Sequence, residues 1–173
     1  LYVKQKGGVG RLTYNGINEK QELYDLLAGG FTMEAFLVNG NSFSSSSDEQ
    51  CLTSSTQSGG YNLTVYKGRY TFSVHTGGSY RNPALEGAPD RVNMAHLMGV
   101  YDPDMKTAAL YVNGEKVSEV SAEGIFALAS GSGWSNIILG GDTTADCGTH
   151  ILSSNTRIAD YKLYPSAMNS LQI

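Results

Sequence analysis

The chain has 173 residues, a formal net charge of −4 and only 16% charged side chains. This length suits one well-buried domain and is short for two independent ones. The 12 basic residues form no cluster, so the composition does not support a nucleic-acid partner or binding to an anionic membrane surface. No run of about 18 or more apolar residues occurs, so the sequence predicts no membrane insertion.

The chain begins with Leu1 instead of Met and shows no signal peptide. We therefore expect a single domain over residues 1–173 that is a module of a larger protein, with its export signal outside this sequence. Glycine, with 21 residues, and tyrosine, with 11, are frequent, which favours strands joined by tight turns over helices.

The first element with a clear signal is a short helix. Asn18 and Gln21 have the spacing of a capping box, and leucines recur at helical spacing between residues 23 and 27. Gly29 and Gly30 then end the segment. We expect a helix of two to three turns that acts as a lid on one end of the fold.

From residue 31 the hydrophobic period changes to two, which indicates strands. Residues 31–37 alternate, residues 61–66 and 69–75 predict a hairpin, and the serine-rich stretch 39–60 predicts a long loop around a short strand. A second irregular loop is expected over residues 76–93. The remaining predicted strands cover 96–101, 108–112, 116–120, 137–139 and 157–164, with a type I′ turn at Asn113 and Gly114.

Many short strands with turn signals and a single helix predict an all-β fold. The expected architecture is a two-sheet antiparallel β-sandwich or jelly roll with one short N-terminal helix.

Four segments, taken together in this order and spacing, resemble the laminin-G-like branch of the concanavalin A-like lectin/glucanase superfamily. They are FTMEAFL (31–37), HLMGVYDPD (96–104), LYVNGEKV (110–117) and RIADYKLYPSAM (157–168). The resemblance implies a concanavalin A-like jelly roll with one concave and one convex sheet. It also implies that ligands bind on the concave sheet or its rim, often near a calcium ion.

The sequence argues against catalysis. Glycosidases in this superfamily carry paired acids as E-x-D-x-x-E on one strand, and this spacing does not occur here, nor do G-x-S-x-G or H-E-x-x-H. We predict a non-catalytic carbohydrate-binding module or lectin-like domain of a secreted or cell-surface protein, monomeric in isolation, with a glycan or polysaccharide as partner. The alternatives are a protein-binding adhesion module that recognises an extracellular protein, a structural accessory domain and, least favoured, a glycoside hydrolase.

Sugar sites combine an aromatic face with planar polar groups. On the predicted hairpin, Tyr66 and His75 lie on the face opposite the apolar residues, where they either bind ligand or form part of a solvated surface. The sequence Tyr80-Arg81-Asn82 then offers an aromatic ring, a guanidinium for an acidic sugar and an amide. Arg81 has an alternative role in anchoring the loop to Glu86 or Asp90.

Trp134, the only tryptophan, has small neighbours and is either an exposed sugar platform or a side chain packed over the sandwich edge. The resemblance implies Asp142 and Asp160 as candidate calcium ligands. Cys51 and Cys147 both have polar, loop-like neighbours and form either one disulfide or two buried free thiols.

Overall fold

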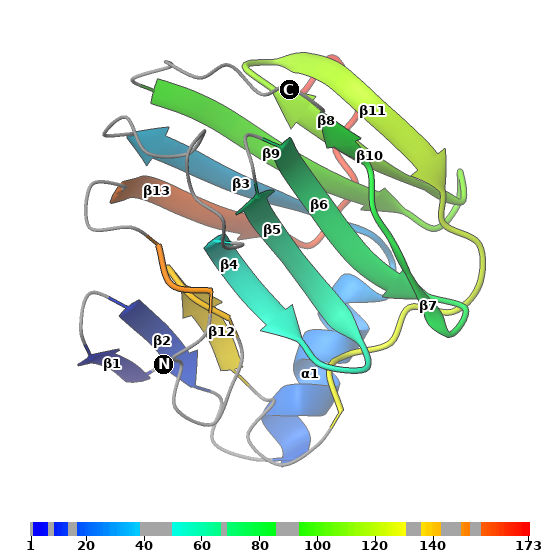
Figure 1. The fold of residues 1–173 in the computed structure, drawn as a ribbon. Helices are drawn as coiled ribbons and strands as arrows, with labels where there is room; N and C mark the ends of the chain where they lie inside the picture. Colours follow the sequence, from blue (N-terminus) through cyan, green and yellow to red (C-terminus); the bar gives the residue numbers. More distant parts are fainter. Residues whose placement is uncertain are drawn as a thin grey trace.

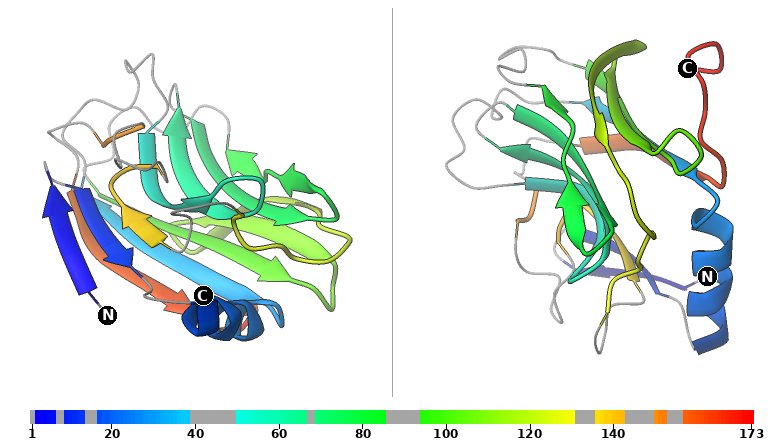
Figure 2. Two further views of the ribbon diagram at one scale, coloured as in Figure 1. Left: turned by 90° about the horizontal axis from the view of Figure 1, so that it is seen from below. Right: turned by 90° about the vertical axis from the view of Figure 1, so that its right-hand side faces the viewer.

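A computed structural model describes residues 2–6, 9–13, 17–38, 50–66, 69–85, 94–130, 136–142, 150–152 and 157–173. Two antiparallel sheets, one of eight strands and one of five, pack face to face (Figure 1). Helix α1 (Ile17–Leu27) lies across one end of this sandwich (Figure 2). The predicted all-β, two-sheet fold with one short N-terminal helix is confirmed. Within the described ranges, no helix is long and apolar enough to cross a membrane.

The eight-stranded sheet has the order β1-β2-β12-β4-β5-β6-β7, and β8 pairs with β6 as a short branch. The predicted hairpin is formed by β5 and β6. Strands β1, β2, β7 and β8 were not predicted. The bounds of the eight strands are β1 Tyr2–Lys6, β2 Val9–Thr13, β4 Gln50–Thr56, β5 Gly60–Tyr66, β6 Arg69–Thr76, β7 Ser79–Arg81, β8 Ala84–Leu85 and β12 Asn136–Leu139.

The five-stranded sheet has the order β11-β10-β9-β3-β13. Asn113 and Gly114, with φ of 52° and 83°, form the turn between β10 and β11, as expected for a type I′ turn. All five strands were predicted. Their bounds are β3 Phe31–Val38, β9 Met94–Asp102, β10 Thr107–Val112, β11 Glu115–Ser121 and β13 Arg157–Tyr164.

One apolar core fills the space between the two sheets. Alternating residues of β3, β5, β6, β9 and β10 point into it, and Phe31 lies in it with no exposed surface. Helix α1 contributes Leu23 and Leu27 to this core, whereas Leu26 is 51% exposed. The helix therefore covers one end of the core, as the leucine spacing indicates.

The C-terminal tail, residues 165–173, lies over the outer face of the five-stranded sheet. The Thr32 hydroxyl donates to the Ser166 carbonyl at 2.9 Å and accepts from the Met168 amide at 2.9 Å. Ala167, Met168 and Ile173 pack on a small apolar cluster on that face, composed of Met98, Val100, Ala109 and Tyr111. Thr32 is therefore buried although it points away from the main core.

The predicted disulfide involves one described cysteine. Cys51 lies buried in β4 instead of in a loop, and its amide donates to the His150 carbonyl at 2.8 Å. This bond brings the chain three residues beyond position 147 against Cys51. Cys147 itself lies outside the described residues, so the bridge stays a prediction.

We expect thiol titration of the unfolded, unreduced chain to find no free thiol. Reduction should then lower the free energy of unfolding by about 4–5 kcal/mol, because the bridge closes a long loop. Cys51→Ser should lose the same stability, and adding reductant to that variant should change nothing further. Two titratable thiols in the unreduced chain would show that no bridge forms.

Candidate functional site

The outer face of the eight-stranded sheet carries a row of polar side chains. Ser54 of β4 stands opposite Asn62 of β5, and Asn62 stands opposite Ser73 of β6. These residues alternate with Tyr61, Leu63, Phe72 and Val74, which point into the core. Since neighbouring strands lie about 4.8 Å apart, the row crosses about 10 Å of the sheet.

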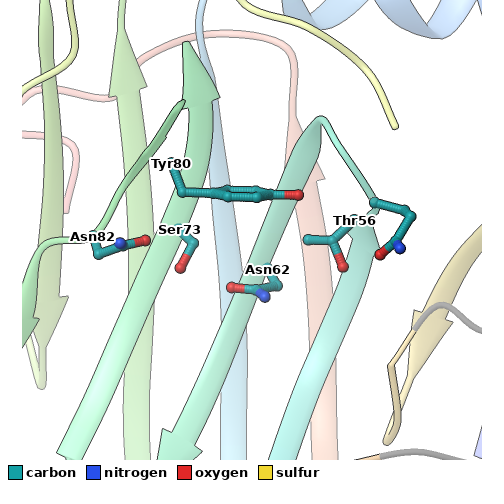
Figure 3. Close-up of a pocket in the computed structure, with 6 residues that line it drawn as sticks. Thr56, Asn62, Ser73, Tyr80 and Asn82 are labelled. Carbon is teal, nitrogen blue, oxygen red and sulfur yellow. The ribbon is translucent and has the colours of Figure 1, made fainter. Parts of the chain in front are cut away.

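A hollow of about 290 Å³ lies over this row. Figure 3 shows Thr56, Asn62, Ser73 and Asn82 side by side across three strands and the chain beyond β7, with the Tyr80 ring above them. The residues that line the hollow are Thr56, Gln57, Asn62, Ser73, Tyr80 and Asn82. This volume is at the lower end of the range for small-molecule sites, which suits a ligand of about one or two sugar rings.

Tyr80 is held at both ends of its side chain. Its hydroxyl donates to the Gly59 carbonyl at 2.8 Å and accepts from the Gly59 amide at 3.3 Å. Its ring makes a T-shaped contact with His75, with centroids 4.9 Å apart. Tyr80 as a whole residue is 36% exposed. Tyr80 therefore spans from β7 to the β4–β5 turn as a fixed wall of the hollow, with one ring face toward the polar residues (Figure 3).

The anchor of Tyr80 depends on the glycines of the β4–β5 turn. Gly60 has a φ of 82°, which favours glycine, and a Cβ at this position would overlap the Ser55 carbonyl oxygen. The turn also places Gln57 at the edge of the hollow. Glycine at residue 60 is therefore a structural requirement of this site.

Asp142, a predicted calcium ligand, lies beside the hollow. Its Oδ1 accepts from the Ser54 hydroxyl at 2.6 Å and from the Thr56 hydroxyl at 3.0 Å, and the two hydroxyl oxygens are 2.8 Å apart. Thr56 belongs to both this group and the hollow. The structure thus connects Asp142 to the polar row through hydrogen bonds between side chains.

Asp160, the other predicted calcium ligand, lies on β13 of the opposite sheet. A hydrogen bond from the Lys162 ammonium, 2.8 Å away, holds the pKa of Asp160 below its usual value. The structure does not bring Asp142 and Asp160 together. The Lys162 ammonium also neutralises the Asp160 carboxylate, which disfavours a calcium ion at that carboxylate. In the part of the chain that the structure describes, no three His, Cys, Asp or Glu side chains gather around one point. Calcium binding stays a prediction.

The remaining predicted site residues are placed as follows. His75 lies on the outer face and supports the Tyr80 ring. Arg81 pairs with Val74 in the strand register, so alternation turns it away from the hollow, and its Nε lies 3.4 Å from the Thr76 hydroxyl. Tyr66 ends β5, but its side chain, like Trp134, Cys147, Glu86 and Asp90, lies outside the described residues.

Sequence reasoning missed Thr56, Gln57, Asn62 and Ser73. Each is a small or amide side chain inside or beside a strand, and none stands out by type. For Asn62 and Ser73 a signal was available, because they alternate with the apolar residues of the predicted hairpin.

The outer face of the five-stranded sheet carries a second polar cluster, centred on Glu34. Its carboxylate accepts from the Tyr164 hydroxyl at 2.7 Å, lies 2.9 Å from His96 Nε2 and 3.6 Å from the Lys162 ammonium. Burial raises the pKa of Glu34, but the hydrogen bonds with Tyr164 and His96 and the Lys162 charge outweigh burial and lower the pKa below its ordinary value. The cluster stabilises the ionised carboxylate.

We therefore expect Glu34→Gln to destabilise the fold at neutral pH but not in acid. A lowered folded-state pKa contributes stability that is present above the unfolded-state pKa and is lost as pH falls through the folded value. The loss at pH 7 should be about 1–3 kcal/mol and should shrink below about pH 4. Urea unfolding at several pH values measures it. Glu119→Gln is the control, since Glu119 forms an exposed pair with Lys116 and should matter little. An equal loss at pH 7 and in acid would contradict this role.

The comparisons with known proteins agree with this geometry at the level of the fold. A laminin-G model of the concanavalin A-like lectin/glucanases superfamily matches residues 13–173. No curated protein matches the chain.

Among solved structures, the receptor-binding domain of botulinum neurotoxin mosaic serotype C/D matches with a TM-score of 0.70 and 14% identity, over 95% of this chain and 38% of that one. The binding domain of serotype D matches with a TM-score of 0.69 and 14% identity, over 98% and 40%. The serotype D ligand-binding domain in complex with N-acetylneuraminic acid matches with a TM-score of 0.69 and 12% identity, over 95% and 38%.

The chain thus spans about two fifths of the length of these structures. At such low identity the likeness shows the fold alone. The family match covers most of the chain and agrees with the resemblance of the four strand segments. The chain belongs to the concanavalin A-like lectin/glucanase superfamily.

Proposed function

We propose that this chain is a non-catalytic carbohydrate-binding domain, and that its ligand binds in the hollow beneath Tyr80. The observation that carries the proposal is the fixed Tyr80 ring facing a row of amide and hydroxyl side chains. A sugar ring has an apolar C–H face that packs on an aromatic ring and hydroxyls that exchange hydrogen bonds with planar amides. Asn62, Ser73 and Asn82 are placed to make these bonds.

The chemistry of the lining favours binding over cleavage. A glycosidase needs two carboxyl groups flanking the scissile bond. The six lining side chains are amides, hydroxyls and a phenol, so none of them is a carboxyl group. The neighbouring Asp142 carboxylate accepts hydrogen bonds from the hydroxyls of Ser54 and Thr56.

The chain is further proposed to be one module of a larger protein. Membership of this superfamily and the likeness to receptor-binding domains support a secreted or cell-surface protein of which this chain is one module. An open site of this size gives weak affinity, on the order of 1 μM to 1 mM. A second module bound to the same glycan would raise the effective affinity.

A screen against immobilised neutral and acidic oligosaccharides tests the proposal. We expect binding to at least one saccharide and no release of reducing sugar from it. Repeating the screen with EDTA tests the predicted calcium, which would be required if binding is lost and restored by added Ca²⁺. Binding to no saccharide in the screen, or release of reducing ends, would contradict the proposed function.

A further inference from the structure

The lining of the hollow is electrically neutral. Its six side chains are two hydroxyls, three amides and a phenol, and none carries a formal charge. Arg81, the guanidinium next to Tyr80 in the sequence, turns to the other face of β7 toward Thr76. Arg69 shares the outer face but does not line the hollow, since it lies four residues from Ser73 along β6, about 13 Å.

The hydroxyl protons beside the hollow are directed away from it. Ser54, Thr56 and Asp142 Oδ1 form a triangle with sides of 2.6, 2.8 and 3.0 Å, and only the two hydroxyls can supply protons to it. The shortest side joins the Ser54 hydroxyl to Asp142 Oδ1, and the Ser54 proton lies along it. The Thr56 proton therefore points either to Asp142 Oδ1 or to the Ser54 oxygen. Thr56 therefore presents lone pairs to the hollow and acts there as an acceptor.

A second acceptor at the hollow has no partner. Within the described residues, Asn62 Oδ1 is buried and makes no hydrogen bond. A buried acceptor without a donor is unfavourable, so a ligand that donates a proton to this amide is favoured. A sugar hydroxyl can donate, whereas a carboxylate or sulfate oxygen can only accept.

We infer that the hollow selects neutral saccharides and rejects sugars that carry a carboxylate or sulfate in contact with Thr56 and Asn62. This selectivity rests on the proposed function and goes beyond it by naming the class of ligand. An acidic group placed there would lose its hydration without gaining a cationic partner, because the amides and hydroxyls of the lining are uncharged, and it would approach the carboxylate of Asp142. The expected ligand class therefore differs from the acidic sugar bound by the serotype D neurotoxin domain.

Matched saccharide pairs test this selectivity. The first pair is polygalacturonate, which is acidic, and the neutral polymer made by reducing its carboxyl groups. The second pair is N-acetyllactosamine with a terminal sialic acid, which is acidic, and N-acetyllactosamine without it, which is neutral. We expect at least one neutral member to bind and its acidic partner to bind at least tenfold more weakly at physiological salt. Acidic members that bind as tightly as neutral ones would overturn the selectivity and leave the proposed function standing. If no member of either charge binds, the proposed function itself fails, and the selectivity with it.

A charge introduced into the lining gives a second readout on the same protein. Asn82→Lys places an ammonium in the hollow and should raise the affinity for the acidic member of a pair by about tenfold relative to the neutral member. Ser79→Lys is the matched control, because Ser79 is exposed on β7, three residues before Asn82, but does not line the hollow. If both lysine variants shift the preference equally, a general charge effect accounts for it and the assignment to this hollow is wrong.

Discussion

Replacement of Phe31 by alanine is expected to lower the free energy of unfolding by about 3–5 kcal/mol. Phe31 has no exposed surface, and its ring lies among the rings of Tyr61, Phe72, Tyr101 and Phe126, with centroids 5.1 to 6.1 Å away. These four rings come from both sheets and from the segment after β11, so the cavity left by the mutation would border several elements. Such a cavity collapses poorly, and its cost adds to the lost burial.

Phe36→Ala is the matched control for this prediction. Phe36 is on the same strand, β3, but on the outer face of the sheet, where it is partly exposed and stacks on His96 at 5.6 Å. We expect a loss of about 1 kcal/mol. Urea unfolding followed by fluorescence or circular dichroism measures both variants. Equal losses at the two positions would contradict the assignment of the core to the inner face of β3.

Replacement of Tyr80 by alanine is expected to weaken saccharide binding ten- to more than a hundredfold. The ring forms the aromatic wall of the hollow, and losing its contact with a sugar face should cost about 1.5–3 kcal/mol, where each 1.4 kcal/mol corresponds to about a factor of ten in Kd. Because Tyr80 is partly exposed on a short edge strand, the fold should survive. Isothermal titration calorimetry with a saccharide found in the screen gives the change in affinity.

Tyr80→Phe separates the ring from its anchor. This variant keeps the aromatic face but loses the hydrogen bonds between the Tyr80 hydroxyl and Gly59. We expect Tyr80→Phe to lose about two- to fivefold in affinity, which is less than the alanine variant loses. The loss arises because the freed ring must be ordered on binding. If Tyr80→Ala binds saccharide like the unchanged protein, Tyr80 does not form the site.

The sequence predicted the five-stranded sheet well, because its strands alternate clearly or end in an Asn-Gly turn. Strand β4 was predicted only as a short, poorly marked strand within a loop. Its sequence, QCLTSST, has no apolar alternation, yet all seven residues are buried in the structure. One of its two neighbouring strands is β5, which follows directly in the sequence, but the other is β12, which is distant in sequence, and a local pattern does not contain that pairing.

Strand pairing also decides which residues line the candidate site. The sequence predicts Tyr80, Arg81 and Asn82 as part of a loop at the rim of a sugar site, with Arg81 either facing the ligand or anchoring the loop. The structure makes Ser79–Arg81 a strand, so side chains alternate: Tyr80 and Asn82 line the hollow and Arg81 does not. Whether three consecutive residues share a face depends on pairing with β6, which residue types alone do not specify.

The proposed function requires that a saccharide binds in the hollow beneath Tyr80, and an NMR titration of the ¹⁵N-labelled domain measures the place of binding directly. With a neutral oligosaccharide selected in the screen, the largest amide shifts should fall on Thr56, Asn62, Ser73 and Asn82, while the five-stranded sheet stays unchanged. Large shifts around Glu34 or the C-terminal tail, with the amides of the hollow unmoved, would place the ligand on the opposite sheet and contradict the account.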